Sequence, residues 1–224
     1  TNNIVCKFKS SDDILKVLFE ADAMKRYHNN PQITLSIPYF PYARQDRVMQ
    51  VGESHSLRVI ADLINSVGFT QVTTADPHSD VVEALVNNLK IIPQHVCAIS
   101  AIGGGKLDDY DYFIAPDAGA LKKIYKLAQL YAKPVICAQK TRSVTDGKIT
   151  GTFISKEDYT NLIGKKALVV DDLVDAGGTF TSLRDILPPD CIVDLYVTHG
   201  IFSKGKQVLT DRFNQVFCYN DMTV

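Results

Sequence analysis

The chain has 224 residues, of which 46% are hydrophobic and 22% charged, and its formal net charge is −1. This composition is typical of a globular protein, and the length allows one large domain or two small ones with a buried core. The near-zero charge gives no reason to expect nucleic-acid or membrane partners, and no apolar run approaches the roughly 20 residues of a membrane helix. The five cysteines (Cys6, Cys97, Cys137, Cys191 and Cys218) form no CxxC pair, which suits buried free thiols in a reducing compartment, so we expect a cytoplasmic protein.

Short apolar runs alternate with segments of helical spacing in the first part of the chain. We predict strands at Ile4–Phe8, Ile33–Ile37 and Val72–Ala75, and helices that begin after Ser11 or Asp12 and cover Ser56–Ser66 and Asp80–Asn87. Gly68 is expected to end the second of these helices. Ile91–Pro93 is expected to link two halves, which predicts half-domains at residues 1–93 and 94–224.

The alternation continues in the second part. Strands are predicted at Tyr112–Ala115, Val135–Ala138, Ala167–Val170 and Cys191–Thr198, with a helix at Leu121–Leu130. Gly103–Lys106 reads GGGK but is not followed by the Ser or Thr of a phosphate-binding P-loop, so a flexible turn is expected. Ser143–Gly164 is polar and long for a loop, which often marks a mobile lid. Strands that alternate with helices predict an α/β fold of parallel sheets flanked by helices.

The stretch Ala167–Ser182, ALVVDDLVDAGGTFTS, carries the strongest chemical signal. Asp171 and Asp172 stand where a buried strand is expected to end, and a small-residue loop then leads into a helix. The loop consists of Asp175, Ala176, Gly177, Gly178 and Thr179. Free N–H groups and the positive end of a helix dipole would converge there on an anion. Two acids beside such a cradle suit a sugar phosphate, while an ordinary strand-to-helix turn is the alternative.

Tyr39–Arg47 follows another predicted strand and contains arginine, amide and acid together with aromatic residues. Arg44 could hold a polyphosphate, and Gln45 or Asp46 could meet a base or a sugar. From the residues alone, a solvated charged loop is an equally good interpretation.

Read together, the motifs resemble a known family. Ala167–Ser182 resembles the phosphoribosyl-pyrophosphate binding motif of type I phosphoribosyltransferases. The motifs PYFPYARQDR, DPH, PDAG, KTR, VVDDLVDAGGT and THG follow one another in the order seen in ribose-phosphate pyrophosphokinases, from about Ser11 to Asp221. The resemblance implies two tandem phosphoribosyltransferase-like half-domains, the N-terminal one on the ATP side and the C-terminal one on the ribose-phosphate side.

The resemblance also implies a reaction, in which the β,γ-diphosphate of ATP moves to the anomeric hydroxyl of ribose 5-phosphate. It implies Mg²⁺ as cofactor, ATP and a ribose phosphate as small-molecule partners, and a homo-oligomer. The ATP-binding residues would be Arg44, Gln45, Asp46 and His78, and the magnesium ligands His78, Asp117 and Asp171. Magnesium prefers oxygen ligands, so His78 could equally have a structural role.

Carried over in the same way, Lys140 and Arg142 would stabilise the transferring group. Asp171 and Asp172 would hold the ribose hydroxyls, and the loop Asp175–Thr179 would bind the 5′-phosphate. Positioning and charge neutralisation supply most of the catalysis in phosphoryl transfer, so a Lys and an Arg at a strand end suit this chemistry.

The sequence departs from the family pattern in several places. The Phe-x-Asp-Gly-Glu motif of the usual N-terminal segment is not found, Ala176 replaces the usual Thr, and Lys123 replaces the usual Arg. The segment between Lys140 and Asp171 is longer than typical. Three alternatives therefore stay open: diphosphate transfer to a larger 5′-substituted ribose such as ADP-ribose, a catalytically silent regulatory subunit, and an ordinary phosphoribosyltransferase.

Overall fold

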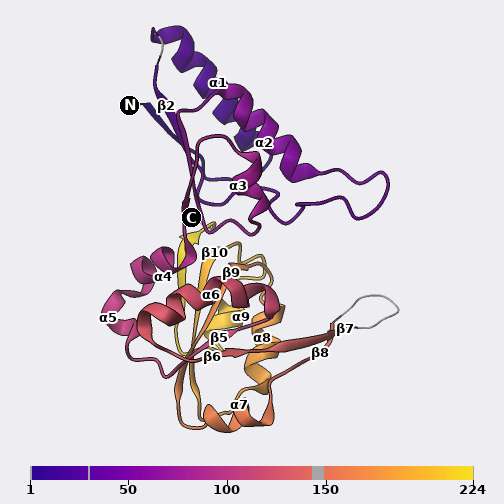
Figure 1. The fold of residues 1–224 in the computed structure, drawn as a ribbon, viewed down its shortest axis with the longest axis vertical. Helices are drawn as coiled ribbons and strands as arrows, with labels where there is room; N and C mark the ends of the chain where they lie inside the picture. The colour runs from indigo at the N-terminus through magenta and orange to yellow at the C-terminus, as the bar shows by residue number, and fades with distance from the viewer. Residues whose placement is uncertain (1, 30, 143–148, 224) are drawn as a thin grey trace. The chain divides into compact units, whose positions relative to one another are not determined.

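The computed structural model describes residues 2–29, 31–142 and 149–223 (Figure 1). The chain divides into two compact units, Thr1–Pro93 and Gln94–Val224, called the N-terminal and C-terminal units below. Each unit contains a parallel sheet with helices packed against it. The predicted α/β class is therefore confirmed.

The N-terminal unit alternates strand and helix throughout. Its elements are β1 (Asn2–Val5), α1 (Asp12–Tyr27), β2 (Ile33–Ser36), α2 (Ser56–Val67), β3 (Gln71–Ala75), α3 (Val81–Leu85) and β4 (Leu89–Ile92). The strands lie in the order β1-β2-β3-β4, and every pair is parallel. Ile33 and Leu35 of β2 are buried whereas Thr34 is not, so alternate side chains enter a core that α1 and α2 cover.

The helix ends of this unit follow local rules in part. Gly68 ends α2 in the left-handed conformation at φ 74°, as predicted. Ser11 occupies the cap position of α1, but its hydroxyl lies 2.7 Å from the Tyr42 hydroxyl. The carboxylate of Asp13 instead accepts the backbone N–H groups of Lys9 and Ser10, both at 2.8 Å.

The C-terminal unit contains a five-stranded sheet and a separate two-stranded hairpin. Its elements are α4 (Gln94–Ile102), α5 (Gly104–Leu107), β5 (Tyr112–Ala115), α6 (Ala118–Tyr131), β6 (Val135–Cys137), β7 (Gln139–Arg142), β8 (Ile149–Phe153), α7 (Lys156–Asn161), β9 (Lys166–Val174), α8 (Gly178–Ile186), β10 (Ile192–Gly200), α9 (Gln207–Thr210) and β11 (Val216–Asp221). The large sheet has the order β11-β10-β9-β5-β6 and is parallel throughout. The order reverses between β5 and β9, which is the point where open α/β sheets bind their ligands.

Of the expected link Ile91–Pro93, only Pro93 lies outside β4, because Ile91 and Ile92 extend this strand, which pairs with β3; the two units divide directly after Pro93. Two other local predictions were wrong. Gly104–Leu107 is the short helix α5, not a flexible turn. The described part of Ser143–Gly164 is also structured: β8 pairs antiparallel with β7, and Ser155 caps α7 by accepting the Asp158 N–H at 3.0 Å. Residues 143–148 lie outside the described part of the chain.

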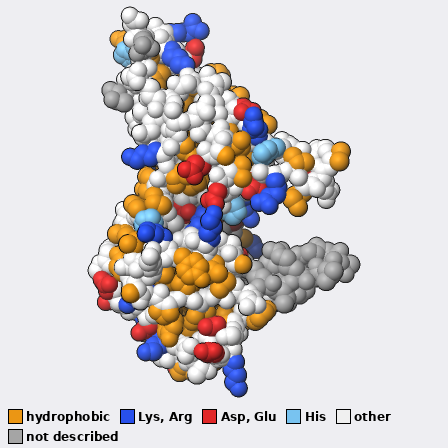
Figure 2. All heavy atoms as spheres, viewed as in Figure 1, with side chains coloured by type: hydrophobic (Ala, Val, Ile, Leu, Met, Phe, Trp, Pro, Cys, Tyr) orange, Lys and Arg blue, Asp and Glu red, His pale blue; other side chains and the backbone are white. Residues whose placement is uncertain are grey.

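The surface is charged in a mixed way. On the face drawn in Figure 2, basic and acidic side chains are interspersed, as expected for a formal net charge of −1. Hydrophobic side chains also appear on the loop between β2 and α2, which projects from the N-terminal unit in Figure 1. None of the helices in the described ranges is long and apolar enough to cross a membrane.

Candidate active site

A pocket of about 720 Å³ opens in the N-terminal unit, where the chain leaves β2 and β3. Its walls are formed by Arg44, Gln45, Asp46, Arg47, Met49, Glu53, Ser54, Ser56 and His78. The four residues predicted to bind ATP are thus brought together in one cavity. A volume of this size lies in the range of small-molecule sites, which is roughly 300–1,000 Å³.

Unusual backbone conformations lie in both segments beside this pocket. Tyr42 and Asp76 are non-glycine residues with positive φ, at 58° and 36°. Such residues are uncommon and cluster at functional sites. The N–H of Gln45 donates to the Tyr42 carbonyl at 2.9 Å, which continues the turn and directs the following side chains into the pocket wall.

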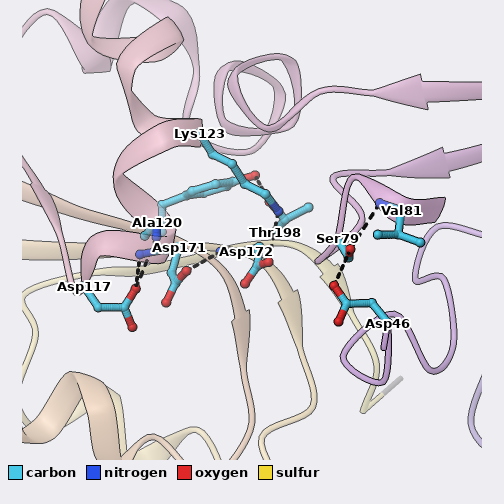
Figure 3. A network of polar contacts seen from close by, with 11 residues as sticks. Asp46, Ser79, Val81, Asp117, Ala120, Lys123, Asp171, Asp172 and Thr198 are labelled. Carbon is cyan, nitrogen blue, oxygen red and sulfur yellow. Dashed lines mark hydrogen bonds and ion pairs between the residues drawn. The ribbon is translucent and has the colours of Figure 1, made fainter. Parts of the chain in front are cut away.

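Asp46 is held firmly by two neighbours. Arg47 donates to both of its carboxylate oxygens, at 2.8 and 3.1 Å, and the buried Ser79 hydroxyl donates at 2.7 Å (Figure 3). The hydrogen bond from Arg47, followed by that from Ser79, lowers the pKa of Asp46 to about 2. Asp46 therefore stays ionised at neutral pH and orients Arg47. Sequence reasoning missed Ser79, because no pattern links it to residues 33 positions earlier.

In the C-terminal unit the acidic pair lies within a strand. Asp171 and Asp172 were expected just after the strand, but β9 continues to Val174 because β10 pairs with it as far as Val174 itself. The pairing with β5 stops earlier, at Ile114 opposite Val169. The two acids therefore lie on a stretch of β9 that no longer has β5 beside it, next to the point where strand order reverses.

A lysine from α6 neutralises one of these acids. Lys123 Nζ donates to Asp172 Oδ2 at 3.0 Å (Figure 3). The two side chains are only 21% and 10% exposed. Asp171 Oδ1 accepts the backbone N–H of Asp172 at 2.8 Å. Burial, and next the adjacent negative charge of Asp172, raise the pKa of Asp171 well above its usual range. The site thus contains two acids in different electrostatic environments.

Asp117 follows β5 at the same switch point and begins α6. Its Oδ1 accepts the N–H groups of Gly119 and Ala120, at 3.0 and 3.2 Å (Figure 3). This is an N-terminal helix cap, which satisfies two of the unpaired amides of the first turn. One oxygen of the predicted magnesium ligand therefore has a structural role.

The loop Asp175–Thr179 has the geometry of an anion cradle. Gly177 caps α8 in the left-handed conformation at φ 83°, and its carbonyl accepts the N–H groups of Phe180 and Thr181 in the first turn of the helix. The N–H groups of Gly177, Gly178 and Thr179 precede these donors, so they stand at the positive end of the helix. A Cβ at Gly177 would lie 3.3 Å from Leu209 Cδ2, which adds a packing reason for glycine.

The remaining predicted residues are only partly placed. Lys140 and Arg142 belong to the backbone of β7, opposite Thr152 and Ile149 of β8. His78 lies in the N-terminal unit, whereas Asp117 and Asp171 lie in the C-terminal unit. Among the described residues, no group of three or more His, Cys, Asp or Glu side chains forms a metal cluster.

The strand order and the glycine-initiated helix that follows the acidic part of β9 define an α/β protein of the type I phosphoribosyltransferase-like class. Residues 3–68 match the model of the N-terminal domain of ribose phosphate pyrophosphokinase. The crystal structure of phosphoribosylpyrophosphate synthetase from Mycobacterium smegmatis superposes with a TM-score of 0.73 at 26% identity, over 89% of this chain and 64% of that one.

Sequence relatives agree with the structural match. The chain is 30% identical to ribose-phosphate pyrophosphokinases of Cereibacter sphaeroides, over 200 residues, and Bradyrhizobium diazoefficiens, over 212 residues. These matches cover 87% and 88% of this chain, and 57% and 62% of the respective relatives. The chain belongs to the ribose-phosphate pyrophosphokinase family.

Proposed function

We propose that this protein transfers the β,γ-diphosphate of ATP, as one unit, to the anomeric hydroxyl of ribose 5-phosphate. The observation that carries this proposal is the pair Asp171 and Asp172 on β9, followed directly by the glycine-capped start of α8. A ribose phosphate presents neighbouring hydroxyls and a terminal phosphate. Carboxylates accept hydrogen bonds from the hydroxyls, and the amides at the start of a helix bind the phosphate.

The pocket of the N-terminal unit is the proposed ATP site. Arg44 would bind the polyphosphate, since a guanidinium forms paired, charge-assisted hydrogen bonds with phosphate oxygens. Gln45, Asp46 and His78, which line the same cavity, would complete the nucleotide site. Asp46 acts there partly through Arg47, whose guanidinium it holds.

The proposed reaction balances as a displacement at phosphorus. The anomeric oxygen forms a bond to the β-phosphorus, the bond from that phosphorus to the α,β-bridging oxygen breaks, and AMP leaves while the hydroxyl proton is released. Lys140 and Arg142 would neutralise the charge on the transferring group, which is the main task of a protein in phosphoryl transfer.

We also propose Mg²⁺ as the cofactor. The acids beside the switch point of the C-terminal sheet supply oxygen ligands, which magnesium prefers, and the ion is commonly bound by one or two carboxylates together with substrate phosphates. The carboxylates of Asp171 and Asp117 fit that mode, and the imidazole of His78 fits it less well. When bound, Mg²⁺ neutralises phosphate charge.

A second substrate is favoured by one residue. Ala176 lies in the anion cradle and offers no hydroxyl to a terminal 5′-phosphate. A 5′-substituted ribose such as ADP-ribose carries a bridging diphosphate at this place. Its binding affinity would be reduced less by the missing hydroxyl than that of ribose 5-phosphate. The chemistry at the anomeric oxygen would be the same.

The proposal is tested by measuring AMP released from ATP and Mg²⁺ in the presence of ribose 5-phosphate, ADP-ribose or neither. We expect AMP in step with consumption of ribose 5-phosphate, and its loss in the Lys140→Ala variant but not in Lys126→Ala, which removes an exposed charge from α6. AMP with ADP-ribose alone would establish the second substrate. No AMP with either sugar would refute both and favour a silent regulatory subunit.

A further inference from the structure

Two buried hydroxyl groups lie next to the acidic pair of β9 and have no role in the function proposed above. They belong to Tyr196 and Thr198 of β10, and both residues are fully buried. The two hydroxyl oxygens are 3.1 Å apart and form a hydrogen bond. A buried hydroxyl is unfavourable unless it is hydrogen-bonded, so this pair has a cost in the sheet that two apolar side chains would not have.

The register of the sheet places this hydroxyl pair beside Asp172. Val170 of β9 is paired with Tyr196 of β10, and the parallel register continues unchanged to the end of both strands. Two residues further on, Asp172 therefore lies opposite Thr198, on the same face of the sheet. Lys123 binds Asp172, so this is the face that α6 covers. Neighbouring strands are about 4.8 Å apart, so the two side chains are direct neighbours, and Figure 3 shows them together below Lys123.

The role expected of Asp172 requires a carboxylate of fixed orientation. Lys123 holds one of its oxygens, Oδ2, at 3.0 Å. The acceptor directions of a carboxylate lie in its plane, so rotation about the Cβ–Cγ bond decides whether it meets two neighbouring hydroxyls of a sugar. A hydrogen bond to one oxygen does not by itself fix this rotation, because the torsion is broad for aspartate.

Thr198 and Tyr196 have the properties of a rigid lateral support. Thr198 is β-branched, which restricts its side-chain torsion, and its hydroxyl is held by that of Tyr196. Tyr196 is among the largest fully buried side chains of the described chain. A ring that is closely packed on all sides has little freedom to move, so the position of its hydroxyl is well defined.

We propose that Thr198 and Tyr196 are positioning residues for Asp172, and that they set how strongly the site prefers a ribosyl substrate with a 2-hydroxyl group. Neither residue touches the substrate: Thr198 fixes the plane of the carboxylate, and Tyr196 fixes Thr198. This inference rests on the proposed function in that Asp172 accepts hydrogen bonds from the ribose hydroxyls. It adds the residues that give this recognition its geometry.

The first test compares ribose 5-phosphate with 2-deoxyribose 5-phosphate, which lacks one of the two neighbouring hydroxyls. Calorimetry with Mg²⁺ and a non-hydrolysable ATP analogue would give the Kd of each sugar and of inorganic phosphate, which has no sugar. We expect Thr198→Val, which keeps the shape of the side chain, to reduce the preference for ribose 5-phosphate about tenfold and to leave the Kd of phosphate unchanged. Thr198→Ser keeps the hydroxyl and should keep the preference within about twofold of the wild type.

The second test separates positioning from stability. Tyr196→Phe removes only the supporting hydroxyl and should reduce the same preference about threefold, because Thr198 itself remains. Tyr110→Phe is the matched control: Tyr110 is a buried tyrosine of the same unit, and its hydroxyl donates at 2.7 Å to Asp194, near the other end of β10. Both variants should lower the free energy of unfolding in urea, but Tyr110→Phe should leave the preference between the two sugars unchanged.

The outcomes distinguish this inference from the proposed function. If the wild-type protein prefers ribose 5-phosphate and neither Thr198→Val nor Tyr196→Phe changes that preference, the positioning role is refuted and the proposed function stands. Equal affinity of the wild type for the two sugars also refutes the positioning role. If the wild type binds neither sugar, the proposed function is refuted as well. Should Thr198→Val fail to fold, the comparison of Tyr196→Phe with Tyr110→Phe decides.

Discussion

A substitution of Lys123 tests whether this lysine stabilises the acidic pair on β9. Its ammonium is 3.0 Å from Asp172 Oδ2, and the side chains are 21% and 10% exposed. Replacing Lys123 by Met keeps much of the apolar stem but leaves Asp172 beside Asp171 without this cation. Exposed ion pairs contribute about 0–1 kcal/mol, whereas removing one partner of a buried pair costs roughly 3–5 kcal/mol.

The exposures place this pair nearer the buried limit, so Lys123→Met should lower the free energy of unfolding by about 2–4 kcal/mol at pH 7. Urea unfolding measures this, and Lys126→Met, on the exposed side of the same helix, is the control with an expected change below about 0.5 kcal/mol. The double variant Lys123→Met with Asp172→Asn should regain most of the loss, because it also removes the carboxylate charge that Lys123 balances. Equal losses in Lys123→Met and Lys126→Met would refute the reasoning.

Four further predictions follow from single features. Asp46→Asn should lower the free energy of unfolding by roughly 2 kcal/mol at pH 7, because the pKa of Asp46 is lowered from 3.8 to about 2. A lowered carboxylate pKa stabilises the fold above pH 4, and this contribution is lost as the pH falls towards 2. The difference in stability between variant and wild type should therefore vanish when thermal unfolding is measured in acid. Gly177→Ala should lower stability by about 1–2 kcal/mol and weaken ribose-phosphate binding by calorimetry, because it forces a Cβ into the left-handed region; unchanged binding would count against the cradle. Lys140→Ala, and separately Arg142→Ala, should reduce kcat by at least ~100-fold with little change in KM, and near-normal turnover would remove both from the reaction. Ala176→Thr should shift the kcat/KM ratio towards ribose 5-phosphate and away from ADP-ribose in competition assays, since a hydroxyl donor to phosphate contributes roughly 1.5–3 kcal/mol, and an unchanged ratio would make Ala176 neutral.

The sequence predicted best those features that depend on local pattern. β5 at Tyr112–Ala115 has the bounds predicted from its apolar run, and Gly68 ends α2 because a left-handed residue is needed there. Local pattern did not predict the pocket of the N-terminal unit. Only the family resemblance grouped Arg44–Asp46 with His78, and these residues line one cavity.

Features that depend on pairing or on distant partners could not be predicted in this way. The carboxylates of Asp171 and Asp172 broke the apolar run, yet β9 continues through them because β10 supplies hydrogen bonds along that stretch. Ile91 and Ile92 were predicted to belong to the link between the halves, but they pair with β3 and extend β4. Ser79 reaches Asp46 across 33 residues, and no spacing rule anticipates a contact of that kind.

The central proposal is that the diphosphate of ATP is transferred to the anomeric oxygen of ribose 5-phosphate. Following this oxygen into the product tests the proposal most directly. Ribose 5-phosphate labelled with ¹⁸O at the anomeric hydroxyl would be incubated with ATP and Mg²⁺, and the product examined by ³¹P NMR. We predict one AMP per product molecule and ¹⁸O retained between the anomeric carbon and a diphosphate. Release of ADP, or a product without ¹⁸O in that bridge, would contradict transfer of the diphosphate to the anomeric oxygen.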